Sequence, residues 1–298
     1  MGVDGGGSRA TALVCDVAGG QLARIDGGPG ILHSGKPEAR GADLARLVVD
    51  ALKAAGAETP AETACFALAG AGREPERGAL RQALTAEGIA RRVLVITDAE
   101  AALEDAFGAG PGLLVISGTG SIAWGRAEDG RQARTGGWGG LLGDEGSGYH
   151  LGICALRAAV RAHDGRGPAT VLLDSILAHT GVSRAEDLIA WVDGAEKHDV
   201  AAMAPLLLEA AVAGDDVSLG IAGAAAHDLV NHVEALYSRL QPWNQPPGLA
   251  LAGGLLCRGR PLRGFLLERV ERFCPQIHVC QSDVDAARGA AGRARRRS

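Results

Sequence analysis

A glycine-rich turn flanked by strand-like segments occurs twice in this chain, and this repeat constrains the fold more than any other feature. The first copy is DGGGS at residues 4–8, and the second is SGTGS at residues 117–121. Each copy is followed by a strand, a turn and a second strand. Self-similarity of this kind predicts two related domains that each open with a glycine-rich hairpin.

The segment after the first hairpin predicts an α/β fold. Buried-strand runs at 64–69 and 93–96 alternate with helical patterns at 39–55 and 76–87. Strands that are joined through helices pair in parallel, with the helices on the faces of the sheet.

The pattern restarts at Gly112, becomes largely helical from Gly148 to about Leu240, and returns to a strand at 248–252. We therefore expect a first domain at 1–111, completed by a C-terminal helix at about 285–298, and a second domain at 112–284.

The two glycine-rich turns are suited to binding phosphate. Successive glycines let the backbone turn tightly and point its N–H groups at one spot, where phosphate oxygens bind. The hydroxyl of Ser8 adds a hydrogen bond, whereas the carboxylate of Asp4 repels a bare phosphate and is explained by a Mg²⁺ ion between them. A tight hairpin explains one such turn, but a matched pair favours phosphate binding.

Other nucleotide folds are excluded by the sequence after each turn. No GK[ST] sequence is found there, and both turns lead into strands instead of helices, which argues against P-loop and dinucleotide-binding folds.

A third glycine cluster, Gly253-Gly254, comes after a buried strand. It is either a helix-entry turn or a place where adenosine approaches the backbone, and we favour adenosine.

Acidic residues mark two further positions. Asp98 comes after the buried run 93–96 and precedes a helical pattern, which suits a general base at a strand end, a helix N-cap, or both.

The segment 136–148 is dense in glycine and carries Asp144 and Glu145. A surface linker is the alternative, but a Trp and two Leu residues favour a loop that lines a ligand and ends at a helix N-terminus. Either acid then binds sugar hydroxyls or caps that helix.

Composition excludes several classes of function. The net charge of -5 argues against nucleic-acid binding. No apolar run reaches the length of a membrane span, and the start lacks a signal segment, so we expect a soluble, cytoplasmic protein without a membrane partner. The six cysteines lack CxxC spacing and the eight histidines lack HExxH spacing, so no metal cluster is expected. The four arginines of 293–297 are interpreted as a solvated basic end.

The chain resembles the N-acetylglucosamine kinase branch of the BadF/BadG/BcrA/BcrD-type ATPase family over nearly its whole length. The resemblance is carried by residues 2–8, 97–99, 116–121 and 136–147. It implies an actin-like fold of two RNase H-like lobes with ATP and Mg²⁺ in the cleft. It also implies phosphorylation of the 6-hydroxyl of a hexosamine, N-acetylglucosamine or glucosamine, and a homodimer.

The resemblance assigns residues to three roles. It makes Asp98 the base that also holds the sugar hydroxyl. Together with the glycine-turn argument, it gives the expected ATP contacts as Asp4, Gly6, Gly7, Ser8, Gly118, Thr119, Gly120, Ala211, Gly253 and Gly254, with Asp4 also on Mg²⁺. The expected sugar contacts besides Asp98 are Ser121, Gly137, Trp138, Gly139 and Asp144.

One departure from the family and two alternative functions remain. The family has an Asn that reads the sugar where this chain has Ile31, an apolar residue without amide hydrogen bonds; His33 or Ser34 is a candidate substitute. The first alternative is an activator ATPase with an iron–sulfur cluster, for which suitably placed cysteines are missing. The second is a non-catalytic sugar sensor, against which Asp98 argues because a sensor needs no base.

Overall fold

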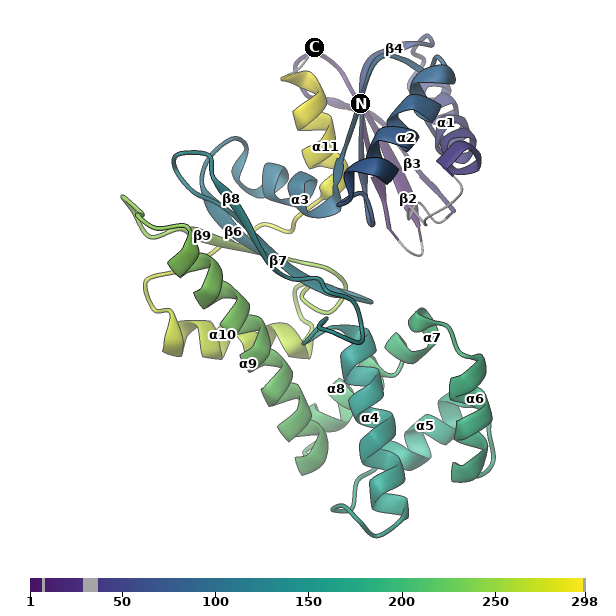
Figure 1. Ribbon diagram of the computed structural model, residues 1–298, viewed down its shortest axis with the longest axis vertical. Helices are drawn as coiled ribbons and strands as arrows, with labels where there is room; N and C mark the ends of the chain where they lie inside the picture. Colours follow the sequence, from purple (N-terminus) through teal and green to yellow (C-terminus); the bar gives the residue numbers. More distant parts are fainter. Residues whose placement is uncertain (7–8, 29–36, 297–298) are drawn as a thin grey trace. The chain divides into compact units, whose positions relative to one another are not determined.

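The computed structural model describes residues 1–6, 9–28 and 37–296. The chain divides into two compact units (Figure 1). The first unit comprises Met1–Gly110 with Val284–Ser298, and the second comprises Pro111–Asp283.

The first unit is built on a mixed sheet with strand order β3-β2-β1-β4-β5. Its strands are β1 (Gly2–Gly5), β2 (Ala10–Cys15), β3 (Gln21–Gly27), β4 (Ala61–Leu68) and β5 (Ala90–Thr97). Strands β1, β2 and β3 pair antiparallel, whereas helices α1 (Pro37–Ala54) and α2 (Glu74–Ala86) precede strands that pair in parallel. The predicted β–α–β alternation is confirmed.

Both faces of this sheet are covered by helices. Along β4, Phe66 and Leu68 belong to a core that includes residues of α1 and α2. The alternate residues Cys65 and Ala67 pack with residues of α3 (Asp98–Phe107) and α11 (Ala286–Arg295). A strand that is covered on both faces carries apolar residues at successive positions. The sequence of β4 therefore shows a continuous apolar run instead of an alternating pattern.

Helix α11 lies very close to its neighbours in the first unit and runs beside α3 (Figure 1). A Cβ atom added to Gly289 would lie 1.9 Å from the carbonyl oxygen of Ala101, and one added to Gly2 would lie 2.2 Å from the nitrogen of Ala291. The small residues of α11 therefore allow backbone-to-backbone packing.

The prediction of a solvated basic end is wrong for part of the tail. Arg293 lies 3.3 Å from the buried carboxylate of Glu104 on α3, and Arg296 also contacts that carboxylate. A buried carboxylate is costly unless cations compensate its charge, so these arginines help to hold α11 on α3.

The second unit repeats the topology of the first. Its strands are β6 (Gly112–Ser117), β7 (Ser121–Arg126), β8 (Gln132–Gly136), β9 (Gly248–Ala252) and β10 (His278–Val279), in the order β10-β9-β6-β7-β8. Strands β6, β7 and β8 pair antiparallel, and β6, β9 and β10 pair in parallel. Because β6 occupies the place of β1 and every neighbour corresponds, the predicted internal repeat is confirmed.

A helical segment separates β8 from β9. It contains α4 (Gly148–His163), α5 (Leu172–Thr180), a 3₁₀ helix (Ala185–Asp187), α6 (Leu188–Gly194), α7 (Lys197–Ala201), α8 (Ala204–Val212) and α9 (Asp216–Arg239), while α10 (Pro261–Phe273) joins β9 to β10. The predicted helical character of the segment from Gly148 to about Leu240 is confirmed, although α7 is too short to show a helical period of its own.

Among the residues that the structure describes, no helix combines the length and the apolar character of a membrane span.

Candidate functional site

The first glycine-rich turn lies beside a cavity of the first unit. The N–H of Gly6 donates to the carbonyl of Arg9 at 2.9 Å and closes the turn between β1 and β2. The cavity has a volume of about 630 Å³, and Asp4, Arg24 and Asp285 are among its lining residues. Four predicted or candidate contacts lie outside the described residues, namely Gly7, Ser8, His33 and Ser34, as does Ile31, which stands where the family has its Asn.

The carboxyl groups around this cavity repel one another. Burial, followed by the charges of Asp98 and Asp285, raises the pKa of Asp4 to about 6, and the nearby cations Arg24 and Arg9 only partly oppose the shift. A bound cation stabilises a carboxylate that is buried beside other negative charges, because it offsets their repulsion. The expected Mg²⁺ contact at Asp4 therefore fits the charge of its surroundings.

Asp98 is the first residue of α3, directly after β5. The helix N-cap is Thr97, whose hydroxyl accepts a hydrogen bond from the N–H of Glu100 at 3.1 Å, so the alternative that Asp98 is the N-cap is wrong. The Asp98 carboxylate accepts a hydrogen bond from the N–H of Ala99 at 2.9 Å. Burial raises the pKa of Asp98. The raised pKa makes this carboxylate a stronger proton acceptor than an exposed aspartate.

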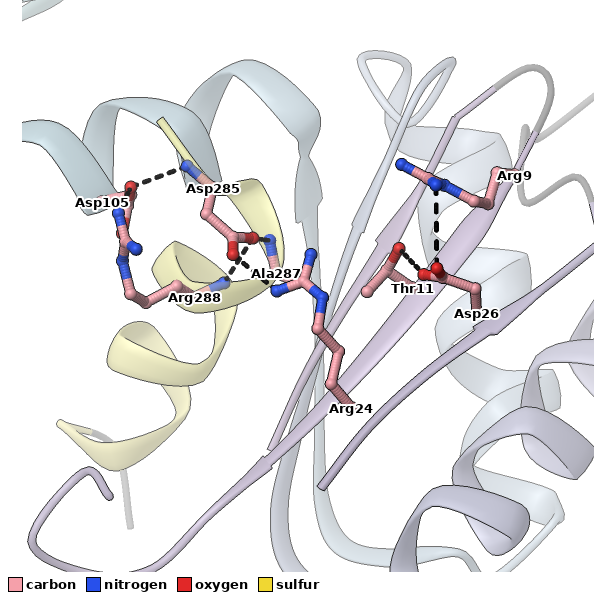
Figure 2. Close-up of polar contacts among 8 residues, drawn as sticks. All are labelled: Arg9, Thr11, Arg24, Asp26, Asp105, Asp285, Ala287 and Arg288. Carbon is pink, nitrogen blue, oxygen red and sulfur yellow. Dashed lines mark hydrogen bonds and ion pairs between the residues drawn. The ribbon is translucent and has the colours of Figure 1, made fainter. Parts of the chain in front are cut away.

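A polar network that the sequence analysis missed borders the cavity (Figure 2). Arg24 on β3 donates to Asp285 at 2.6 Å, and the same Asp285 caps α11 by accepting from the N–H groups of Ala287 and Arg288. Burial raises the pKa of Asp285, but the hydrogen bonds from Arg24 and the Arg288 N–H outweigh it and lower that pKa below the usual range. Arg288 in turn donates to Asp105 on α3 at 2.6 Å. The network ties β3, α11 and α3 together at the cavity.

The second glycine-rich turn is held by the start of α4, within the second unit. The N–H of Gly148 donates to the carbonyl of Gly118 at 2.7 Å. In the described part of the chain, the N–H groups of Thr119 and Gly120 donate to no protein acceptor. They therefore remain available to an anion.

Gly253 and Gly254 lie next to this turn. Gly253 has a φ of 88°, and a Cβ atom there would lie 2.2 Å from the carbonyl oxygen of Ser117, so only glycine fits. That carbonyl accepts a hydrogen bond from the N–H of Leu255 at 3.1 Å. A Cβ atom on Gly254 would meet no atom within 4 Å, which leaves its surroundings open.

Asp144 is buried beside the second turn and carries an ion pair. It is 4% exposed, has a φ of 60°, and accepts a hydrogen bond from the ammonium of Lys197 at 2.5 Å. Its carboxylate oxygen would lie 3.2 Å from a Cβ atom on Gly120. The structure thus brings Asp144 to the predicted phosphate turn, and it adds Lys197, a residue that no sequence motif singled out.

The neighbouring residues clarify how the loop enters α4. Ser147 is the N-cap and accepts from the N–H of His150 at 3.1 Å, so neither Asp144 nor Glu145 caps this helix, contrary to that alternative. The hydroxyl of Ser121 donates to the carbonyl of Glu145 at 2.7 Å. The loop is therefore tied to β7 and α4, which argues against the linker alternative.

The remaining predicted contacts differ in exposure. Trp138 is 64% exposed, with the Arg134 guanidinium 4.8 Å from its ring centroid, and the flanking Gly137 and Gly139 both have positive φ angles. Ala211, on α8, is buried in the core of the second unit. The roles of these residues in binding sugar or nucleotide stay predictions.

The sequence matches the model of one protein family and is similar to individual proteins over nearly its whole length. The model of the BadF/BadG/BcrA/BcrD ATPase family matches residues 1–294. The chain is 33% identical to the N-acetylmuramic acid/N-acetylglucosamine kinase of Clostridium acetobutylicum, covering 97% of this chain and 96% of that protein. It is 30% identical to the N-acetyl-D-glucosamine kinase of Dictyostelium discoideum, covering 98% and 96%.

A solved structure is also similar over nearly the whole chain. It is that of a candidate N-acetylglucosamine kinase from Chromobacterium violaceum, with a TM-score of 0.82 and 29% identity, and the match covers 97% of this chain and 96% of that one.

Proposed function

Since this chain belongs to the BadF/BadG/BcrA/BcrD ATPase family, we propose that it is an ATP-dependent kinase of an amino sugar. The predicted family and the predicted actin-like ATPase fold are confirmed. The relatives from Clostridium acetobutylicum and Dictyostelium discoideum are amino-sugar kinases, which supports the reaction class. The structural observation that carries the proposal is Asp98, a half-buried carboxylate at the end of β5 that acts electrostatically on Asp4 of the first glycine-rich turn.

We propose that the glycine-rich turns hold the phosphates of ATP. In the second unit, the N–H groups of Thr119 and Gly120 and the hydroxyl of Thr119 provide donors for phosphate oxygens. In the first unit, Gly7 and Ser8 have the corresponding role, while the N–H of Gly6 closes the turn.

The adenosine is proposed to lie at Gly253 and Gly254. Position 253 accepts only glycine, because a Cβ atom there would collide with the second turn. At Gly254 the space around the backbone is open. A flat base or ribose can approach a backbone that carries no side chain.

Asp4 is the residue proposed to hold Mg²⁺, directly or through water. Its pKa of about 6 leaves it largely ionised at neutral pH, and a cation would relieve its repulsion from Asp98 and Asp285. When bound, Mg²⁺ neutralises charge on the phosphates during transfer.

Asp98 is proposed to activate the acceptor. Its carboxylate accepts the proton of the sugar 6-hydroxyl as the hydroxyl oxygen forms a bond to the γ-phosphorus and the bond from that phosphorus to the ADP oxygen breaks. Burial, which raises its pKa, favours this proton transfer. The sugar is proposed to be N-acetylglucosamine or glucosamine and the enzyme a homodimer, with the sugar surrounded by Ser121, Gly137, Trp138, Gly139 and Asp144.

The experiment is a coupled ADP assay with amino sugars, their N-acetyl forms and plain hexoses. We expect Asp98→Asn to leave ATP binding nearly intact and to lower turnover at least about 100-fold, as loss of a general base does. The same change at Asp43, an exposed residue of α1, is the matched control and should have no effect.

Three results would contradict the proposal. Near wild-type turnover in Asp98→Asn would remove that residue from its role. ATP hydrolysis without sugar phosphate would favour the activator ATPase, and sugar binding without turnover would favour a sensor.

A further inference from the structure

Lys197 presents its ammonium group to solvent while it holds a buried carboxylate. The Nζ atom lies 2.5 Å from Asp144 Oδ2 and 5.4 Å from the ring centroid of Tyr149. The Lys197 side chain is 42% exposed, whereas that of Asp144 is 5% exposed. An ammonium carries three N–H donors, so a donor remains for a ligand after Asp144 has accepted one.

Lys197 also lines a small cavity of the second unit, and the other residues that line it are uncharged. The cavity has a volume of about 250 Å³, and its apolar walls include Leu141, Ile153, Val192 and Val200. Gly140 also lines it, directly after Trp138 and Gly139 in the sequence, which are proposed sugar contacts. The cavity therefore adjoins the proposed sugar-binding loop and joins a cation to an apolar surface.

We propose that Lys197 and this cavity form a subsite for a carboxylate carried on a short, partly apolar side chain of the amino sugar. The proposal rests on the proposed function, because Asp144 positions Lys197 beside the sugar. N-acetylmuramic acid, with its lactyl ether, is the probe of choice, and it is also in the name of the Clostridium acetobutylicum relative. The new element is Lys197 as the residue that holds the lactyl carboxylate. Lys197 is a specificity residue here and takes no part in phosphoryl transfer.

The charge and the cavity walls suit a carboxylate on a short apolar chain. A carboxylate bound to Lys197 makes a carboxylate–ammonium–carboxylate arrangement with Asp144, in which the ammonium lies between two negative charges. The half-exposed ammonium loses little hydration on binding, and the apolar walls suit the methyl group of a lactyl chain. A hydrogen bond to a charged group of this kind strengthens binding by about 10-fold or more.

The first test changes the ligand and leaves the protein intact. Calorimetric titration without ATP compares N-acetylmuramic acid with its uncharged carboxamide. We expect the acid to bind about 10-fold more tightly, and we expect this ratio to fall as salt is added, since a half-exposed ion pair is screened. Equal affinity for the acid and the amide, or binding of neither, would overturn the subsite.

The second test changes the cavity. Lys197→Met should bring the acid-to-amide ratio close to one, whereas loss of a purely structural role would weaken both ligands alike and leave the ratio unchanged. Val192→Asp, on a partly exposed wall position, should lower the ratio, and Val192→Asn, which has the same shape without the charge, should preserve it. An unchanged ratio in Lys197→Met or in Val192→Asp would refute the assignment.

Failure of the proposed function gives a different result. If no sugar phosphate forms while the acid still binds more tightly than the amide, the kinase proposal fails and the subsite stands. If N-acetylglucosamine is phosphorylated and the ratio equals one, the subsite fails and the kinase proposal stands.

Discussion

Replacing Gly289 by alanine tests whether the first unit depends on the close packing of α11. The added Cβ would lie 1.9 Å from the carbonyl oxygen of Ala101 and 2.9 Å from the nitrogen of Asp105, both backbone atoms of α3. Ordinary contact begins near 3.4 Å, so α11 has to move away from α3 by more than about 1 Å. Overpacking of this kind costs about 1–3 kcal/mol, against a helix-propensity gain of about 0.5–1 kcal/mol for Gly→Ala.

Gly292 in the same helix is the matched control, because a Cβ atom there would meet nothing within 4 Å. Gly292→Ala should therefore stabilise the protein by about 0.5–1 kcal/mol, whereas Gly289→Ala should have a net cost of up to about 2.5 kcal/mol. The two variants should shift the melting temperature in opposite directions, by about 2–4 °C for each kcal/mol.

Differential scanning calorimetry of both variants, without nucleotide, measures this difference. A melting temperature of Gly289→Ala at or above that of the wild type would refute the close-packing argument. Since Asp285, the N-cap of α11, lines the same cavity as Asp4, Gly289→Ala should also weaken ATP binding, which Gly292→Ala should not do.

Two further predictions concern the proposed Mg²⁺ and adenosine contacts. The pKa of Asp4 is about 6 in the folded protein, above the ordinary 3.8, so the folded protein holds this proton more tightly than the unfolded chain does. Ionised Asp4 therefore destabilises the fold fully above pH 6 and not at all below pH 3.8. Asp4→Asn should therefore raise the melting temperature at pH 7.5 without Mg²⁺ and lose that advantage as the pH is lowered towards about 4; a gain independent of pH would contradict this account. Gly253→Ala should destabilise the second unit because its Cβ meets Ser117, whereas Gly254→Ala should fold normally and raise the KM for ATP. A normal melting curve for Gly253→Ala would oppose the first assignment, and an unchanged KM for Gly254→Ala would oppose the second.

Local patterns in the sequence determined the architecture of both sheets. Strands such as β4 and β9 are short apolar runs that end near glycine, and the two glycine-rich turns have the same flanking hairpins, so the repeated topology arises from neighbours along the chain. The position of Asp98 was equally predictable, because a residue after a buried parallel strand lies at the carboxyl edge of the sheet. The pattern did not identify Thr97 as the helix cap, a role that the sequence analysis offered to Asp98.

The tertiary structure alone decided which distant charges meet. Arg24 pairs with Asp285 across 261 positions of sequence, and Lys197 reaches Asp144 across 53. Periodicity reports only which face of an element is buried, whereas an ion pair depends on how separate elements pack. For the same reason the terminal arginines read as a solvated tail, although the packing of α11 on α3 places two of them at the buried carboxylate of Glu104.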